Sequence, residues 1–255
     1  MSKICNAQSD GGLYVPFRMF HIGESVMGDR INDAQRVIDE VSKAVVGKKD
    51  ILTKIMTAIL AGGHVLIEDI PGTGKTTMAL AFSRAMGLKV NRVQFTPDVL
   101  PADLTGFTVY QKETGKFVYQ PGAAVCNLLL ADEINRTSPK TQSALLEVME
   151  EHQVTVDGVT HRTGEPFIVI ATENPAGSAG TQLLPESQLD RFMICVSMGY
   201  PTVEEEMEIL RRGQTGSRTY EEVTPVIDAE DLIRMRREAG SVYVHDRIWR
   251  YIAEL

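Results

Sequence analysis

The chain has 255 residues, of which 43% are hydrophobic and 24% are charged, and it carries a net charge of −8. This composition is that of a globular protein with a sizeable core, and its acidic excess disfavours non-specific binding to nucleic acid, which needs clustered Lys and Arg. The sequence shows neither a run of 18 apolar residues nor an apolar signal segment near its start. Three widely spaced cysteines suit a reducing compartment, so we expect a cytoplasmic protein without a membrane segment, with Cys126 and Cys195 in its core.

The first part of the chain divides into an arm, two helices and a strand. Residues 1–25 show no sustained hydrophobic period, and we expect a loose arm there. Apolar residues then recur at helical spacing over 31–45, and a second helix is expected over 50–61. The short apolar run 64–68 is typical of a buried strand.

Strand-like and helix-like segments alternate along the middle of the chain. Further strands are expected at 91–95, 127–132, 166–171 and 191–198, and helices at 75–86 and 139–151. Such alternation predicts an α/β fold in which helices cover a parallel sheet. Two hairpins are expected to interrupt it, at 107–120 and 154–161, and the second of them turns at Asp157-Gly158.

The C-terminal part of the chain changes to charged helical segments. Thr202 with Glu205 three residues later has the form of a capping box, and Asp228 is expected to cap a further helix. We therefore expect residues 26–200 to form an α/β core and residues 201–255 to begin a helical domain.

The segment IPGTGKTT, residues 70–77, connects an expected strand to an expected helix, which is the context of a phosphate-binding loop. Gly72 and Gly74 allow backbone conformations that turn N–H groups toward an anion, and the helix adds its positive N-terminal end. Asp69 replaces the first glycine of the usual pattern, at the strand exit, where a side chain can point away from the phosphates. The alternative is a plain strand-to-helix turn. The residues expected to contact nucleotide are Pro71, Gly72, Thr73, Gly74, Lys75, Thr76 and Thr77.

The segment NLLLADEINR places Asp132 and Glu133 at the end of a buried strand. Parallel α/β sheets bind their ligands at that end of the strands. Lys75 would contact the β- and γ-phosphates of ATP, and Thr76 and Asp132 would hold Mg²⁺. Glu133 would polarise the attacking water. The alternative is a solvated acid pair.

Two more polar residues stand at the ends of expected strands. Asn174 follows IVIATE and could hydrogen-bond the γ-phosphate or the water, or it could simply form a turn before Pro175. Arg191, in LPESQLDRF, could stabilise the charge of phosphoryl transfer, or it could form a surface ion pair.

Six ordered segments resemble the MoxR family of AAA+ ATPases: AVVGKKD, PGTGKT, QFTPDVLPADLTG, LLLADEINRTSPKTQSALLEVMEEHQVTV, IATENP and LPESQLDRF. The resemblance implies an AAA+ αβα core with a parallel sheet and an insertion in helix 2, followed by a helical lid. It also implies assembly into rings, usually homo-hexamers, and an ATP-driven chaperone activity, often with a von Willebrand factor A domain partner. Part of the family carries Asp at the position of Asp69.

The resemblance also assigns roles to residues of this chain. Val46 and Gly47 would lie near the adenine, Asn174 would be the sensor-1 residue, and Arg191 would be the arginine finger that reaches the nucleotide of a neighbouring subunit. Both hairpins would face the ring pore or a client. Arg136 would meet the neighbour or form a structural salt bridge.

The sensor-2 arginine of the family is expected beyond Leu255, so the resemblance implies a lid that is incomplete in this chain. Three alternatives to an ATP-hydrolysing chaperone stay open, and the missing lid segment favours the first of them. They are an ATP-dependent assembly switch with negligible turnover, a magnesium-chelatase-like ATPase subunit, and a nucleic-acid motor. The acidic net charge and the few basic residues of the hairpins count against the last of these.

Overall fold

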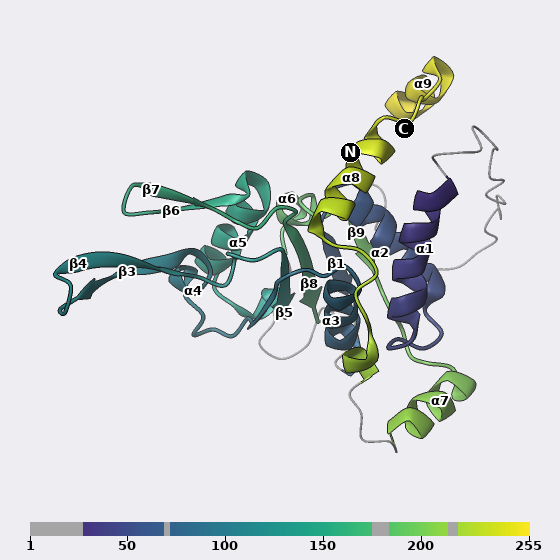
Figure 1. Cartoon of the computed structure of the whole chain (residues 1–255), viewed down its shortest axis with the longest axis horizontal. Helices are drawn as coiled ribbons and strands as arrows, with labels where there is room; N and C mark the ends of the chain where they lie inside the picture. The colour runs from purple at the N-terminus through teal and green to yellow at the C-terminus, as the bar shows by residue number, and fades with distance from the viewer. Residues whose placement is uncertain (1–27, 69–71, 175–183, 214–218) are drawn as a thin grey trace.

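The computed structural model describes residues 28–68, 72–174, 184–213 and 219–255. A five-stranded parallel sheet forms its centre, in the order β2-β5-β8-β1-β9 (Figure 1). Its strands are β1 (Val65–Glu68), β2 (Val90–Gln94), β5 (Leu128–Asp132), β8 (Ile168–Glu173) and β9 (Ile194–Val196). The expected arm at 1–25, together with Asp69 and Pro71, lies outside the described residues.

Helices cover both faces of the sheet, as the alternation of segments predicts (Figure 1). On one side lie α1 (Gly28–Ser42), α2 (Lys49–Leu60) and α3 (Lys75–Ala85), and on the other α4 (Pro101–Thr105) and α5 (Pro139–Glu151). The remaining helices are α6 (Glu186–Leu189), α7 (Val203–Gly213), α8 (Ala229–Gly240) and α9 (Asp246–Glu254), with short 3₁₀ turns at Ile134–Arg136 and Thr219–Glu222.

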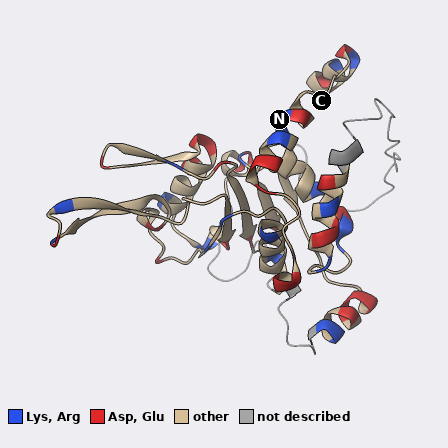
Figure 2. Cartoon of the chain, in the orientation of Figure 1, with Lys and Arg blue, Asp and Glu red and all other residues tan. Residues whose placement is uncertain are grey.

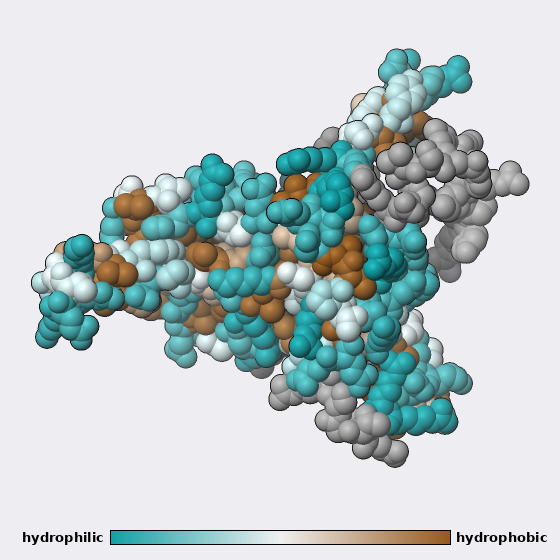
Figure 3. Space-filling view, viewed as in Figure 1, coloured by the Kyte–Doolittle hydropathy of each residue, from teal (hydrophilic) through white to brown (hydrophobic). Residues whose placement is uncertain are grey.

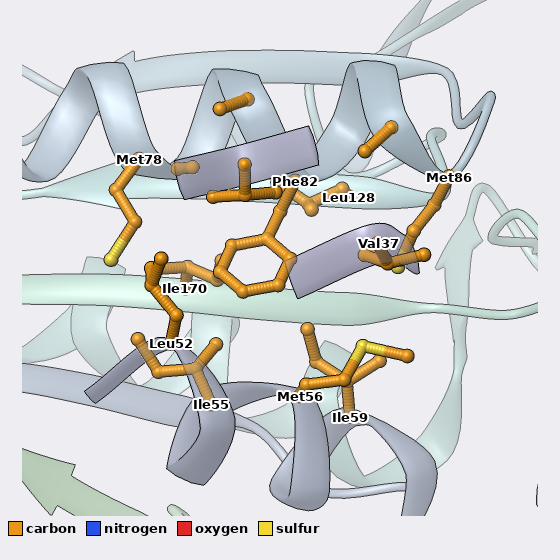
Figure 4. Close-up of a cluster of buried hydrophobic side chains, with 14 of the residues drawn as sticks. Val37, Leu52, Ile55, Met56, Ile59, Met78, Phe82, Met86, Leu128 and Ile170 are labelled. Atoms are coloured by element: carbon orange, nitrogen blue, oxygen red, sulfur yellow. The ribbon is translucent and has the colours of Figure 1, made fainter. Parts of the chain in front are cut away.

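The central strands are apolar up to the polar residues at their C-terminal ends, because each has a core on both of its faces. Leu128 and Leu130 of β5 pack in the cluster formed with α1, α2 and α3 (Figure 4), whereas Leu129 and Ala131 pack with α5. Alternate residues of a strand point to opposite faces of a sheet, so one short run serves two cores. Phe82 of α3 lies at the centre of the first cluster and is fully buried.

Both expected hairpins are present. They consist of β3 (Gly106–Gln111) with β4 (Lys116–Pro121) and of β6 (Gln153–Val156) with β7 (Val159–Arg162). The two hairpins extend from the same side of the core (Figure 1), and the rings of Tyr119 and His161 stack between them at 3.7 Å.

The expected strand 191–198 is longer than the observed one, because residues 191–193 form a turn before β9 begins. The strand expected at 166–171 begins later, at Ile168, after Pro166, which has no N–H to donate to a ladder. The short helix α4 was not expected from the sequence. Cys126 is buried as expected, but Cys195 is exposed, since β9 forms an edge of the sheet.

Both helix caps expected in the C-terminal part are present. Glu205 N–H donates to Thr202 Oγ1 at 3.2 Å and Asp231 N–H to Asp228 Oδ1 at 2.9 Å. α7 carries acidic residues in its first turn and basic residues in its last (Figure 2), which suits the helix dipole. Leu232 of α8 packs in the same core cluster as α1, α2 and α3. A separate helical domain from residue 201 stays a prediction.

The face of the molecule in Figure 3 combines scattered apolar residues with a hydrophilic background. On the first hairpin Phe107, Tyr110 and Phe117 are exposed, and on α9 so are Trp249 and Tyr251. Within the described ranges, no helix combines the length and the apolar character that crossing a membrane would need.

Candidate nucleotide-binding site

The loop between β1 and α3 is held open by two glycines in left-handed conformations. Gly72 has a φ of 90° and Gly74, the N-cap of α3, a φ of 85°. A Cβ atom at either position would meet no other atom within 4 Å. It is therefore the backbone conformation, and not crowding, that calls for glycine here. These are the conformations expected of a loop that turns its N–H groups toward an anion.

The loop and the acid pair, far apart in sequence, come together at the carboxyl end of the sheet. Lys75 begins α3 and is buried, and the hydroxyl of Thr76 donates to Asp132 Oδ2 at 3.5 Å. β8 lies between β1 and β5, so this contact joins the ends of two strands that are not adjacent in the sheet. The structure thus joins the two motifs that the sequence singles out.

Asp132 is buried and receives hydrogen bonds at both of its carboxylate oxygens. Thr172 Oγ1 donates to Oδ1 at 3.3 Å, and Arg92 Nε donates to Oδ2 at 2.7 Å. Neither partner was expected from the sequence. A usable signal exists for Thr172, a polar residue near the end of the apolar strand β8, but Arg92 looks like any exposed residue of an edge strand.

Glu133 has a left-handed backbone conformation, with φ 58° and ψ 48°. Its N–H donates to Thr172 Oγ1 at 2.9 Å, and Arg136 Nη1 donates to its Oε2 at 2.8 Å. Burial opposes ionisation of the carboxyl, but hydrogen bonds from Arg136 and Asn174, with the charges of Arg136 and Lys75, hold its pKa below the usual value. Glu133 is therefore a carboxylate at neutral pH, and Arg136 forms the salt bridge that was one of its two expected roles.

The backbone of Asn174 is held in place by the side chain of Asn135. Asn135 Nδ2 donates to Asn174 O at 2.9 Å, and Asn174 N–H donates to Asn135 Oδ1 at 3.3 Å. Both residues are buried. Asn174 in turn hydrogen-bonds Glu133 through its side chain. Asn135 was not among the residues expected at the site, although it lies within the acidic motif.

A second pair of acids lies at the same edge of the sheet. Glu68 of β1 and Glu173 of β8 are register partners on adjacent parallel strands. Partial burial, with the nearby charge of Glu68, raises the pKa of Glu173 to about 7.

The segment expected near the adenine lies against α7. Gly47 has a φ of 73° and lies so close to Glu205 that an added Cβ would overlap this side chain. Lys48 Nζ forms an ion pair with Glu205 at 3.5 Å and donates to Tyr200 O at 3.1 Å. Val46 is partly buried beside it. Contact of Val46 and Gly47 with adenine stays a prediction.

Arg191 lies apart from the carboxylates of the loop site and pairs with Glu150 of α5 at 2.5 Å. Both side chains are about half exposed, at 44% and 53%. This is the surface ion pair that was the alternative to an arginine finger. A role toward a neighbouring subunit stays a prediction.

The residues present fit a magnesium ion bound together with a nucleotide. Among the residues that the structure describes, no group of three His, Cys, Asp or Glu side chains could hold a metal. Mg²⁺ in phosphate-transfer sites needs only one or two protein ligands, since phosphate oxygens and water complete its shell. Thr76 and Asp132 offer such a pair.

Comparisons with known proteins point to one family of ATPases. The family model described as "ATPase family associated with various cellular activities (AAA)" matches residues 64–194. The chain is 49% identical to the uncharacterized protein YeaC of Bacillus subtilis over 86% of this chain and 68% of that one. It is 38% identical to "Chaperone MoxR1" of Mycobacterium tuberculosis, over 91% of this chain and 61% of the relative.

A solved structure shows the same fold. It is the crystal structure of an inferred ATPase from Cytophaga hutchinsonii, which is 40% identical, with a TM-score of 0.81, over 89% of this chain and 68% of that one. The chain thus spans about two thirds of the length of these relatives. From the family match, the fold and the relatives together, the chain belongs to the AAA family of ATPases, in its MoxR-type branch.

Proposed function

We propose that this chain binds ATP with Mg²⁺ and hydrolyses it to drive chaperone-like remodelling of partner proteins. The observation that carries the proposal is the contact between Thr76 and Asp132, which joins the phosphate loop to the acidic strand end. The name of the M. tuberculosis relative, a chaperone, supports the remodelling role.

Each residue at the site has a role in this proposal. The loop from Gly72 to Thr77 binds the phosphates, with Lys75 on the β- and γ-phosphates. Mg²⁺, held by Thr76 and Asp132, neutralises the charge that develops on the phosphates.

Glu133 orients and polarises the water that attacks the γ-phosphate. Glu133 is a carboxylate at neutral pH, so it can accept a proton from this water. Asn174, which hydrogen-bonds Glu133, would contact the γ-phosphate or the water.

We further propose a homo-oligomeric ring, of six subunits as the family resemblance implies, in which Arg191 acts on the nucleotide of the neighbour. The exposed position of Arg191 on its own subunit supports this arrangement. The acidic net charge and the few basic residues of the hairpins favour a protein client over a nucleic-acid one, and the exposed aromatic residues of the first hairpin offer it an apolar contact. A von Willebrand factor A domain protein is a candidate partner.

The test is phosphate release from Mg-ATP per subunit, measured across a hundredfold range of protein concentration. We expect the specific activity to rise with concentration, Lys75→Ala to abolish ATP binding, and Arg191→Ala to abolish turnover while binding survives. Binding without turnover at any concentration would instead favour the assembly switch.

A further inference from the structure

Arg92 reaches from the edge strand β2 onto the carboxylate proposed to hold magnesium. It stands two residues before the end of β2, where Gln94 is the register partner of Asp132. Its Nε lies 2.7 Å from Asp132 Oδ2. The Arg92 side chain is 50% exposed, whereas that of Asp132 is 7% exposed, so a mobile cation from the surface pairs with a fixed, buried anion.

The contact falls on the oxygen that faces the phosphate loop. Thr172 donates a hydrogen bond to Asp132 Oδ1, whereas Asp132 Oδ2 accepts hydrogen bonds from both Arg92 and Thr76. A magnesium ion held between Thr76 and Asp132 must use this same oxygen, directly or through a water molecule. Arg92 therefore occupies the place in which the proposed metal site would form.

We propose that Arg92 is a positioning residue that competes with magnesium for Asp132. In the metal-free site it compensates the charge of a carboxylate that would otherwise be buried and unpaired. When Mg²⁺ enters with a nucleotide, the guanidinium moves away, because two cations on one carboxylate oxygen repel each other. This inference rests on the proposed Mg-ATP function.

The surroundings of Arg92 make this exchange possible. Its guanidinium is half in solvent, and Arg92 Nη2 already lies 3.4 Å from Gln94 Oε1, a second acceptor on the same strand. The consequence is a site whose magnesium affinity is lower than the Thr76–Asp132 pair alone would provide.

The test is a magnesium titration of the binding of a fluorescent ATP analogue at fixed nucleotide, followed by fluorescence rather than by turnover. We expect Arg92→Gln to lower the half-maximal magnesium concentration by roughly tenfold, since it removes a like charge beside the metal. The matched control is Arg84→Gln, which removes the same charge from α3, where Arg84 Nη1 donates to Tyr220 O. We expect this control to titrate as the wild type does.

A second measurement follows the melting temperature of the same variants. Arg92→Gln leaves Asp132 without its counter-charge, so we expect a lower melting temperature in EDTA and a larger gain on adding Mg²⁺ with nucleotide than for the wild type. If Arg92→Gln does not fold, Arg92→Lys keeps a charge without the Nε contact, and we expect an intermediate titration from it.

The outcomes separate this inference from the function on which it rests. Suppose that nucleotide binding by the wild type depends on magnesium, and that Arg92→Gln needs the same or a higher half-maximal magnesium concentration. This result overturns the competition between Arg92 and magnesium but does not contradict the proposed function. A wild type that binds the analogue equally well with and without magnesium overturns the competition, and a wild type that does not bind the analogue at all overturns the function as well.

Discussion

Asp132 and Glu133 are neighbours in sequence, yet their side chains have different partners. Asp132 is buried between Thr172 and Arg92, whereas Glu133 is turned by its left-handed backbone toward Arg136 and Asn174. The Asp132 carboxylate therefore faces the hydroxyl of Thr76, and the Glu133 carboxylate faces Asn174. Because the two side chains point to different partners, Asp132 can bind a metal ion while Glu133 polarises a water molecule.

The role proposed for Glu133 predicts a separation of binding from turnover. Glu133→Gln keeps the size of the side chain and its contact with Arg136, so we expect ATP binding to survive while phosphate release falls by roughly 10²- to 10⁴-fold. Glu147→Gln, an exposed change on α5, is the matched control and should keep full activity. Equal turnover in both variants would remove Glu133 from the mechanism.

Glu173 predicts a pH dependence of stability. Its pKa of about 7 in the folded protein lies above the ordinary value of 4.5, so the folded state holds the proton more tightly than the unfolded one. The stability that this group contributes is therefore complete below about pH 4.5 and is lost as the pH rises to about 7.

The measurement is denaturant unfolding at pH 5 and pH 8. We expect Glu173→Gln to lose less stability than the wild type between these two pH values. Glu113→Gln, in the exposed turn of the first hairpin, should behave as the wild type does. A wild-type pH dependence in Glu173→Gln would show that Glu173 titrates normally.

Among the elements, α5 is the helix whose first and last residues the local sequence predicts best. Ser138 and Pro139 mark its start, and the helix runs over residues 139–151 as expected. The N-cap hydrogen bond, Thr141 N–H to Ser138 Oγ at 3.3 Å, satisfies one of the free donors of the first turn. The ends of strands were less predictable, because hydrogen bonding to a neighbouring strand, and not the composition of the strand itself, decides where the strand stops.

The cap of α5 yields a prediction on stability. We expect Ser138→Ala to lower the free energy of unfolding by about 1 kcal/mol. Ser143→Ala, farther along the same helix and exposed, should change it little, since Ala favours a helix interior. Chemical denaturation of both variants measures the difference, and an equal effect would mean that the cap contributes nothing.

At the scale of the whole molecule, the C-terminal part shares the core of the α/β fold. Leu232 and Met235 of α8 belong to the cluster of α1, α2 and α3. Val226 N–H donates to Ala85 O at 2.8 Å, and Arg236 Nε donates to Ile59 O at 2.9 Å. Residues 223–240 are thus tied to the core by packing and by hydrogen bonds.

This shared core predicts a single unfolding transition. We expect Leu232→Ala to lower the free energy of unfolding by roughly 2–5 kcal/mol through the cavity that it leaves. Leu210→Ala, at a leucine of α7 that is 64% exposed, should have a small effect. Calorimetry distinguishes the cases, because an independently folding helical domain would show its own transition, and only that one would respond to Leu232→Ala.

The sequence by itself determined most of the helices and strands, both hairpins, the phosphate loop and the acid pair. These features depend on the spacing of apolar residues, on the backbone conformations that glycine allows and on helix-capping side chains. Each of these signals acts over a few neighbouring residues. Only the tertiary structure decided that Arg92 reaches Asp132, that Asn135 holds Asn174, and that Glu173 faces Glu68. Those contacts depend on the order and register of parallel strands that the chain joins through long crossovers, and no local pattern encodes which strand will lie beside which.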